Sequence, residues 1–122
     1  MIVERQCTFD AAHHLPHYVG KCHQVHGHHF KVSLAVEGQI MEEHGFVVDF
    51  SRLKDWLKDH VVDQFDHTLL NDTIENPTAE NILLYIKKEF DSTGWQVSSD
   101  ITLAYIKVWE TEDSMAMEDY RR

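Results

Sequence analysis

An alternating run at residues 28–37 constrains the fold of this chain more than any other feature of its sequence. Successive side chains of a strand point to opposite faces, so an apolar residue at every second position predicts a strand with one buried face. After His28 that face consists of Phe30, Val32, Leu34 and Val36, opposite His29, Lys31, Ser33 and Glu37. The chain is therefore expected to build a sheet that covers a hydrophobic core on one side.

The remaining pattern predicts an α+β fold, in which two strands, two helices and two more strands follow one another. The predicted elements are strands at residues 2–10 and 28–37, helices opening at Asp49-Phe50-Ser51 and Asn76-Pro77-Thr78, and strands at residues 101–110 and 115–120. Thr78 is the expected N-cap of the second helix, and Gly94 is its expected end. The outer strands of such a sheet keep unpaired edges, which predicts self-association with a site shared between subunits.

Two helical faces are expected to cover this sheet, because their apolar residues recur at helical spacing. These faces comprise Leu53, Trp56, Leu57, His60, Val61, Gln64 and Phe65 in the first helix, and Ile82, Leu83, Ile86 and Phe90 in the second.

Composition narrows the class of protein. With 122 residues and 43% hydrophobic residues, the chain is expected to form one domain, residues 1–122. A formal net charge of −10 argues against nucleic acid or an anionic membrane as the main partner. Cys7 and Cys22 are too few for a disulfide scaffold, and no signal peptide or long apolar run is recognised. The cytoplasm is therefore the expected compartment.

Clustered histidines predict a metal site, since seven of the ten lie between His13 and His29. His26 and His28 share one face of an extended segment, and Gly27 between them allows another group to approach closely. A third imidazole from a separate segment, best His13, would complete a zinc site with one coordination position open for substrate. Such an open position is typical of catalytic rather than structural zinc.

Three other positions allow two interpretations each. Cys22 is either a fourth zinc ligand, which would close the site, or a thiol activated as a base by the nearby cation. Asp66-His67 is either a carboxylate–imidazole relay or a histidine at the end of a helix, where the helix dipole favours it. Glu110 extends an apolar face, where an unpaired carboxylate is costly, or is a surface acid at a strand end.

Six motifs in order carry a family resemblance. They are Phe9-Asp10-Ala11-Ala12-His13, Cys22-x3-His26-Gly27-His28, Val48-Asp49-Phe50, Asp66-His67-x2-Leu70-Asn71, Asn76-Pro77-Thr78-Ala79-Glu80 and Trp109-Glu110-Thr111. Together they resemble the 6-pyruvoyl-tetrahydropterin synthase family over essentially the whole chain. The three-residue spacer after Cys22 is similar to that of its bacterial 6-carboxytetrahydropterin synthase branch, whereas residues 112–117 depart from the form typical of bacterial members.

The resemblance implies the T-fold, a ββααββ subunit whose trimers close a β-barrel and stack in pairs into a homohexamer. It also implies roles for the singled-out side chains. His13, His26 and His28 would bind Zn²⁺, Cys22 would be the base, Asp66 and His67 would assist proton transfer, and Glu110 would anchor the pterin ring with Thr78 and Glu80 nearby.

The implied reaction converts 7,8-dihydroneopterin triphosphate to 6-carboxy-5,6,7,8-tetrahydropterin, acetaldehyde and triphosphate, in the pathway to queuosine and other 7-deazapurines. One alternative is the pyruvoyl outcome, in which triphosphate is eliminated without cleavage of the side chain. A second is a zinc-binding module without turnover, which Cys22 as a fourth ligand would favour. A zinc hydrolase is disfavoured, because the chain has no His-Glu-x2-His motif. Lys21 and Lys31 are candidates for binding the triphosphate.

Overall fold

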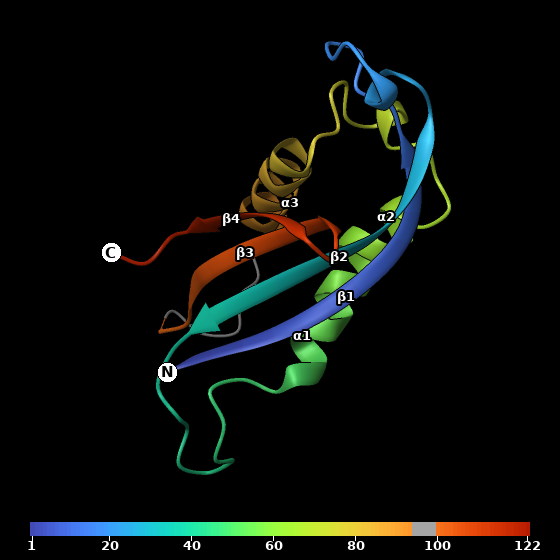
Figure 1. Ribbon diagram of the computed structural model, residues 1–122. Coiled ribbons are helices and arrows are strands. Elements are labelled where there is room, and N and C mark those ends of the chain that lie inside the picture. Colours follow the sequence, from blue (N-terminus) through green and yellow to red (C-terminus); the bar gives the residue numbers. More distant parts are fainter. Residues whose placement is uncertain (94–99) are drawn as a thin grey trace.

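A computed structural model describes residues 1–93 and 100–122 and shows a four-stranded antiparallel sheet with helices on one face (Figure 1). The strands are β1 (Ile2–His13), β2 (His26–Glu37), β3 (Thr102–Thr111) and β4 (Ser114–Asp119), in the order β1-β2-β3-β4. This confirms the predicted succession of two strands, a helical region and two strands, with β4 as an edge strand. The predicted helix end at Gly94 lies outside the described residues.

Strands β1 and β2 form a long hairpin whose loop end lies beside His13, His26 and His28. Their register runs from Ile2 opposite Glu37 to His13 opposite His26, so β1 continues past its predicted end at residue 10. The extra residues keep their backbone groups paired with β2. β3 pairs with β2 only from Lys31 onward, so the hairpin extends beyond β3 and β4 (Figure 1).

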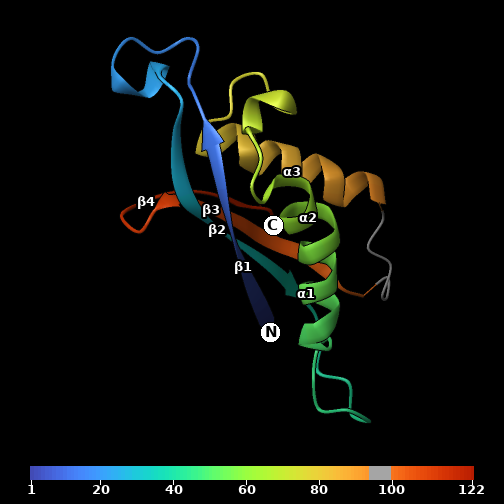
Figure 2. The same ribbon diagram turned by 90° about the vertical axis from the view of Figure 1, so that its right-hand side faces the viewer.

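The helical region covers one face of the sheet (Figure 2). It contains α1 (Phe50–Leu57), a π-helical turn (Lys58–Val62), α2 (Asp63–Phe65), a 3₁₀ turn (Leu70–Asp72) and α3 (Ala79–Thr93). Asp49 caps α1 by accepting the Ser51 N–H at 2.8 Å, and the Thr78 hydroxyl accepts the Asn81 N–H at 3.1 Å, so both predicted helix starts are confirmed. In the described part of the chain no helix is long and apolar enough to span a membrane.

One predicted core position is wrong. Gln64 is exposed, whereas Val61 and Phe65 are fully buried. The π-helical turn that precedes α2 explains the difference, because an i→i+5 turn carries one residue more than an α-helical turn and rotates the following side chains.

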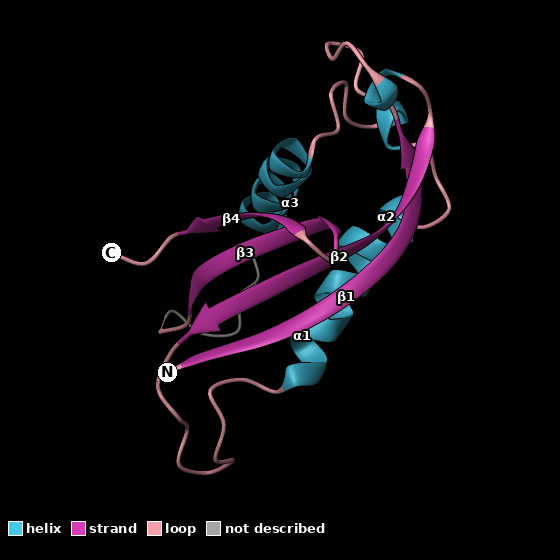
Figure 3. Ribbon diagram, viewed as in Figure 1, coloured by secondary structure: helices cyan, strands magenta, loops and turns pink. Residues whose placement is uncertain are grey.

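The hydrophobic core lies between the sheet and the helices that cover one of its faces (Figure 3), and it extends to the histidines at the end of the β1–β2 hairpin. Phe9 of β1 stacks on Phe30 of β2 with ring centroids 5.2 Å apart, and Phe65 of α2 lies 5.6 Å from Phe9. Burial of an aromatic side chain of this size contributes roughly 1.5–3 kcal/mol to stability. The His13 ring packs nearly perpendicular to the Phe30 ring with centroids 5.5 Å apart, so imidazole follows the phenylalanines in the packing. The hydrophobic core therefore fixes the position of the histidine cluster.

Candidate active site and metal centre

Three imidazoles converge at the loop end of the β1–β2 hairpin. His13 and His26 are paired in the register, and His28 lies two residues along β2 on the same face. One ring nitrogen from each histidine lies within 4.8 Å of the other two, and the Nε2 atoms of His13 and His26 are 3.1 Å apart. Among the residues that the structure describes, these three make up the cluster able to hold a metal ion.

Backbone carbonyls orient two of the rings. The Nδ1 atom of His13 lies 2.8 Å from the Pro77 carbonyl oxygen, and that of His26 lies 2.8 Å from the Gln24 carbonyl oxygen. A carbonyl only accepts, so each Nδ1 donates and each Nε2 keeps a lone pair. The Nε2 of His28 is buried without a hydrogen-bond partner in the described structure. An unsatisfied buried nitrogen is costly, and a bound metal ion would satisfy it.

The protonation states also suit a metal ion. Burial lowers the pKa of His13 and of His28 below 6.5, and the nearby Glu110 carboxylate only partly offsets this. Both imidazoles are therefore neutral at neutral pH, which is the form that ligates metals.

We expect metal-free protein to lose stability as the pH falls below about 7. The unfolded chain takes up protons on these two imidazoles near pH 6.5, whereas the folded chain resists until a lower pH. The unfolded state then binds more protons, so the free energy of unfolding decreases on acidification. Urea unfolding of EDTA-treated protein between about pH 8 and pH 5 measures this slope. The His28→Gln variant should show a shallower slope, and an unchanged slope would contradict the account.

Glu110 brings a carboxylate to the same cluster. Its side chain is 26% exposed, with Oε1 at 3.6 Å from the His28 Nε2 and Oε2 at 3.8 Å from the His13 Nε2. The pairing of β3 with β4 shifts between Trp109 and Thr111, so Glu110 lies at a bulge. Sequence reasoning placed this acid on the apolar face but missed its contact with the histidines, which depends on the register of three strands.

Cys22 lies in a 3₁₀ turn, Lys21–His23, within the loop that joins β1 to β2. Its thiol is free and half-buried, and its carbonyl accepts the Leu15 N–H at 2.8 Å, which ties the loop together. The three-histidine cluster does not include its sulfur. Cys7, the other cysteine, packs against the core, and burial raises the pKa of its thiol to about 12.

Asp66 and His67 lie along the outer edge of β1. The Asp66 carboxylate accepts the Asp10 N–H at 2.9 Å, and the His67 N–H donates to the Asp10 carbonyl at 2.7 Å. These bonds hold His67 at a φ of 61°, an uncommon conformation for a residue other than glycine. Its ring is 81% exposed, with Nε2 3.6 Å from the Asp66 carboxylate. His67 and His28 line one open pocket of about 650 Å³.

Thr78 and Glu80 lie at the start of α3. The Thr78 hydroxyl is engaged in capping the helix, whereas Glu80 lines a second pocket, of about 460 Å³, together with Glu110 and Met115. The two acids predicted to lie near a pterin therefore share one pocket.

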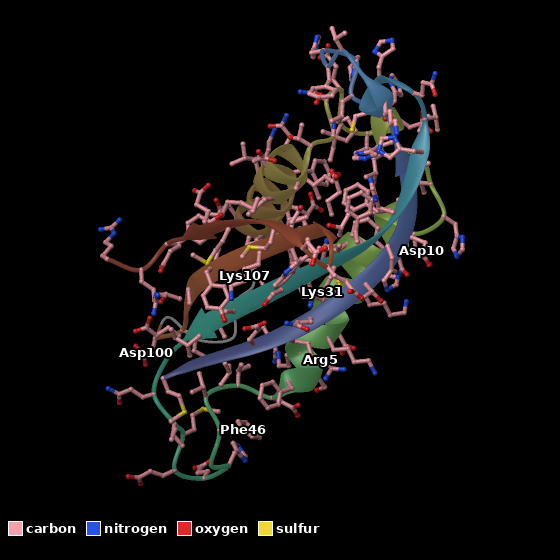
Figure 4. The ribbon with its side chains drawn as sticks, in the orientation of Figure 1. Arg5, Asp10, Lys31, Phe46, Asp100 and Lys107 are labelled. Atoms are coloured by element: carbon pink, nitrogen blue, oxygen red, sulfur yellow. The ribbon has the colours of Figure 1, made fainter. Side chains whose placement is uncertain are left out.

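Of the two lysines considered for binding the triphosphate, Lys31 lies on β2 and Lys21 lies in the β1–β2 loop. Figure 4 shows Lys31 and Lys107 near the middle of the sheet, on neighbouring strands. The Lys31 ammonium lies 4.1 Å from the centroid of the Trp109 ring, and that of Lys107 lies 4.7 Å from the Tyr105 ring. Strand alternation places Lys31 on the face opposite His28. Lys21 lies in the turn beside Cys22.

Residues 2–120 match the family model described as 6-pyruvoyl tetrahydropterin synthase. The chain belongs to this family. Membership in the 6-pyruvoyl tetrahydropterin synthase family makes the chain a lyase-type enzyme, and the four-stranded sheet with its two main helices is the family's T-fold.

Relatives within the family carry different names. A protein of Archaeoglobus fulgidus, named "Putative 6-carboxy-5,6,7,8-tetrahydropterin synthase", is 43% identical over 95% of this chain and 93% of its own length. The dihydroneopterin monophosphate aldolase of Pyrococcus furiosus is 36% identical over 86% of this chain and 85% of its own. The structure of Caenorhabditis elegans 6-pyruvoyl tetrahydropterin synthase superposes with a TM-score of 0.84 at 25% identity, covering 99% of this chain and 96% of the other.

Proposed function

We propose that this chain is a zinc-dependent 6-carboxytetrahydropterin synthase. Its substrates would be 7,8-dihydroneopterin triphosphate and one water molecule, and its products 6-carboxy-5,6,7,8-tetrahydropterin, acetaldehyde and triphosphate, on the route to queuosine. The observation that carries the proposal is the cluster of three imidazoles, two of them oriented by backbone carbonyls and the third with an unpaired Nε2, in a family of lyase-type enzymes. The 43% identical relative favours the carboxy product.

In this mechanism His13, His26 and His28 hold the zinc ion, which when bound supplies Lewis acidity to the hydroxyls of the substrate side chain. The Cys22 thiolate removes a proton from the carbon next to the pterin ring. His67, polarised by Asp66, passes protons to and from the side chain as triphosphate leaves.

The pterin ring needs its own partner. Its 2-amino-4-oxo edge presents N–H donors, and the largely buried Glu110 carboxylate would accept them in charge-assisted hydrogen bonds. Glu80 lies in the pocket that Glu110 also lines, and Thr78 begins the adjacent helix. These residues would fix the ring while the histidines act on its side chain.

We further propose a cytoplasmic homohexamer of single-domain subunits, formed by two stacked trimers whose sheets close a barrel. Support comes from the outer strands β1 and β4, which form the edges of the sheet. The 81% exposed His67 ring at the β1 edge is placed where a neighbouring subunit could cover it. The net charge of −10 supports a small-molecule substrate rather than nucleic acid or a membrane.

A mass-spectrometric product assay tests the proposal. Zinc-replete protein incubated with 7,8-dihydroneopterin triphosphate is expected to yield 6-carboxytetrahydropterin and acetaldehyde, and EDTA-treated protein is expected to yield neither. A pyruvoyl product would favour the alternative shared with the Caenorhabditis elegans structure. Cleavage of dihydroneopterin monophosphate instead would favour the activity named for the Pyrococcus furiosus relative. Zinc binding without any turnover would leave a non-catalytic zinc module.

A further inference from the structure

We propose that the Glu110 carboxylate is a fourth ligand of the metal ion when no pterin is bound. Glu110 reaches the cluster from β3, whereas the three histidines come from β1 and β2. Its two oxygens divide between two imidazoles, with Oε1 facing His28 and Oε2 facing His13. No feature of the sequence that predicted the histidine site pointed to this contact.

The distances match the edges of a coordination polyhedron. With metal–ligand bonds of about 2.0–2.2 Å and tetrahedral angles, two ligand atoms lie about 3.4 Å apart. The observed separations are 3.1 Å between the His13 and His26 nitrogens, 3.6 Å from Glu110 to His28, and 3.8 Å from Glu110 to His13. Each Glu110 oxygen therefore lies at about the separation expected between two ligands of one metal ion, measured from the imidazole nitrogen that it faces.

The carboxylate has little else to bind. Distances of 3.6 and 3.8 Å are too long for hydrogen bonds, so neither histidine satisfies it in that way. In residues 1–93 and 100–122, these two nitrogens are its closest cationic or potentially cationic partners within 4.0 Å. A carboxylate that is mostly removed from water requires a partner, and a divalent ion between it and the imidazoles would provide one.

This inference rests on the proposed function in one respect. In the proposed function, Glu110 accepts hydrogen bonds from the N–H groups of the pterin ring. One carboxylate cannot bind the ring and coordinate the metal ion at the same time. Arrival of the pterin would draw Glu110 from the metal and open the position that the substrate hydroxyls need. The metal site would then remain closed to other ligands until the pterin ring is bound.

Metal affinity measured without any pterin tests the inference on the whole protein. The Glu110→Gln variant removes the charge, whereas Glu110→Asp keeps the charge but shortens the side chain by one methylene. Glu80→Gln is the matched control, since Glu80 lines the same pocket without an ion pair to the histidines. Competition with a chromophoric chelator gives the zinc dissociation constant. We expect both Glu110 variants to bind zinc at least ~10-fold more weakly, and Glu80→Gln to stay within about twofold.

The charge-conserving variant decides between ligation and attraction at a distance. Wild-type affinity in Glu110→Asp, or in Glu110→Gln, would overturn the inference. The visible spectrum of the Co²⁺-loaded protein gives a second readout, expected to be shared by wild type and Glu80→Gln and shifted in Glu110→Asp. An unshifted spectrum in Glu110→Asp would overturn the inference as well. Failure of the product assay with these metal-binding results intact would reject only the proposed reaction.

Discussion

Replacing His28 by alanine is expected to weaken zinc binding by roughly 10²–10³-fold and to reduce turnover to background. His28 supplies a buried Nε2 that has no hydrogen-bond partner in the described structure, so its removal takes away a ligand without leaving a substitute. Structural zinc sites with four ligands bind with roughly 10–16 kcal/mol, so one ligand accounts for roughly 2.5–4 kcal/mol, which is about 10²–10³-fold in affinity. Equilibrium dialysis with elemental analysis measures the bound zinc, and the product assay measures turnover.

The adjacent residue provides the control. His29 points to the opposite face of β2, where its 65% exposed ring bonds the Asp10 carboxylate at 2.7 Å. His29→Ala should therefore retain zinc within about twofold of wild type, because no metal ligand is removed. Loss of zinc in His29→Ala with retention in His28→Ala would show that the ion binds on the other face of the sheet.

Local patterns predicted most of this fold. The alternation at residues 28–37 places Phe30, Val32 and Leu34 in the core, where all three are fully buried. The caps at Asp49 and Thr78 begin the helices where the sequence indicated. Two-residue and helical periodicities are properties of neighbouring residues, so they can be read without knowledge of the rest of the chain.

Features that depend on distant pairing could not be predicted in this way. The clustering of histidines already suggested His13 as the third ligand, but its position directly opposite His26 follows only from the hairpin register. The contact of Glu110 with His28 further requires the pairing of β3 and the bulge at its end. The exposure of Gln64 depends on a π-helical turn, for which the spacing of apolar residues gave no signal.

Replacing Cys22 by alanine is expected to leave zinc binding unchanged and to lower turnover by roughly 10²–10⁴-fold. The cluster that can hold the metal consists of three histidines without the Cys22 sulfur, so removal of the thiol removes no ligand. In the proposed mechanism the same thiol is the base, and loss of a positioned base has an effect of this size. Zinc content and single-turnover rates, measured on the same preparation, separate binding from chemistry.

Cys7→Ala is the matched control, because it removes the other thiol of the chain. Burial raises the pKa of Cys7 to about 12, so this thiol stays protonated and cannot serve as a base near neutral pH. Its loss should cost about 1 kcal/mol of stability through a smaller core side chain while zinc content and turnover persist. A different pattern, in which Cys22→Ala loses its zinc and Cys7→Ala does not, would make Cys22 a metal ligand. The centre would then be closed by a thiolate, which would favour the non-catalytic zinc module over a lyase.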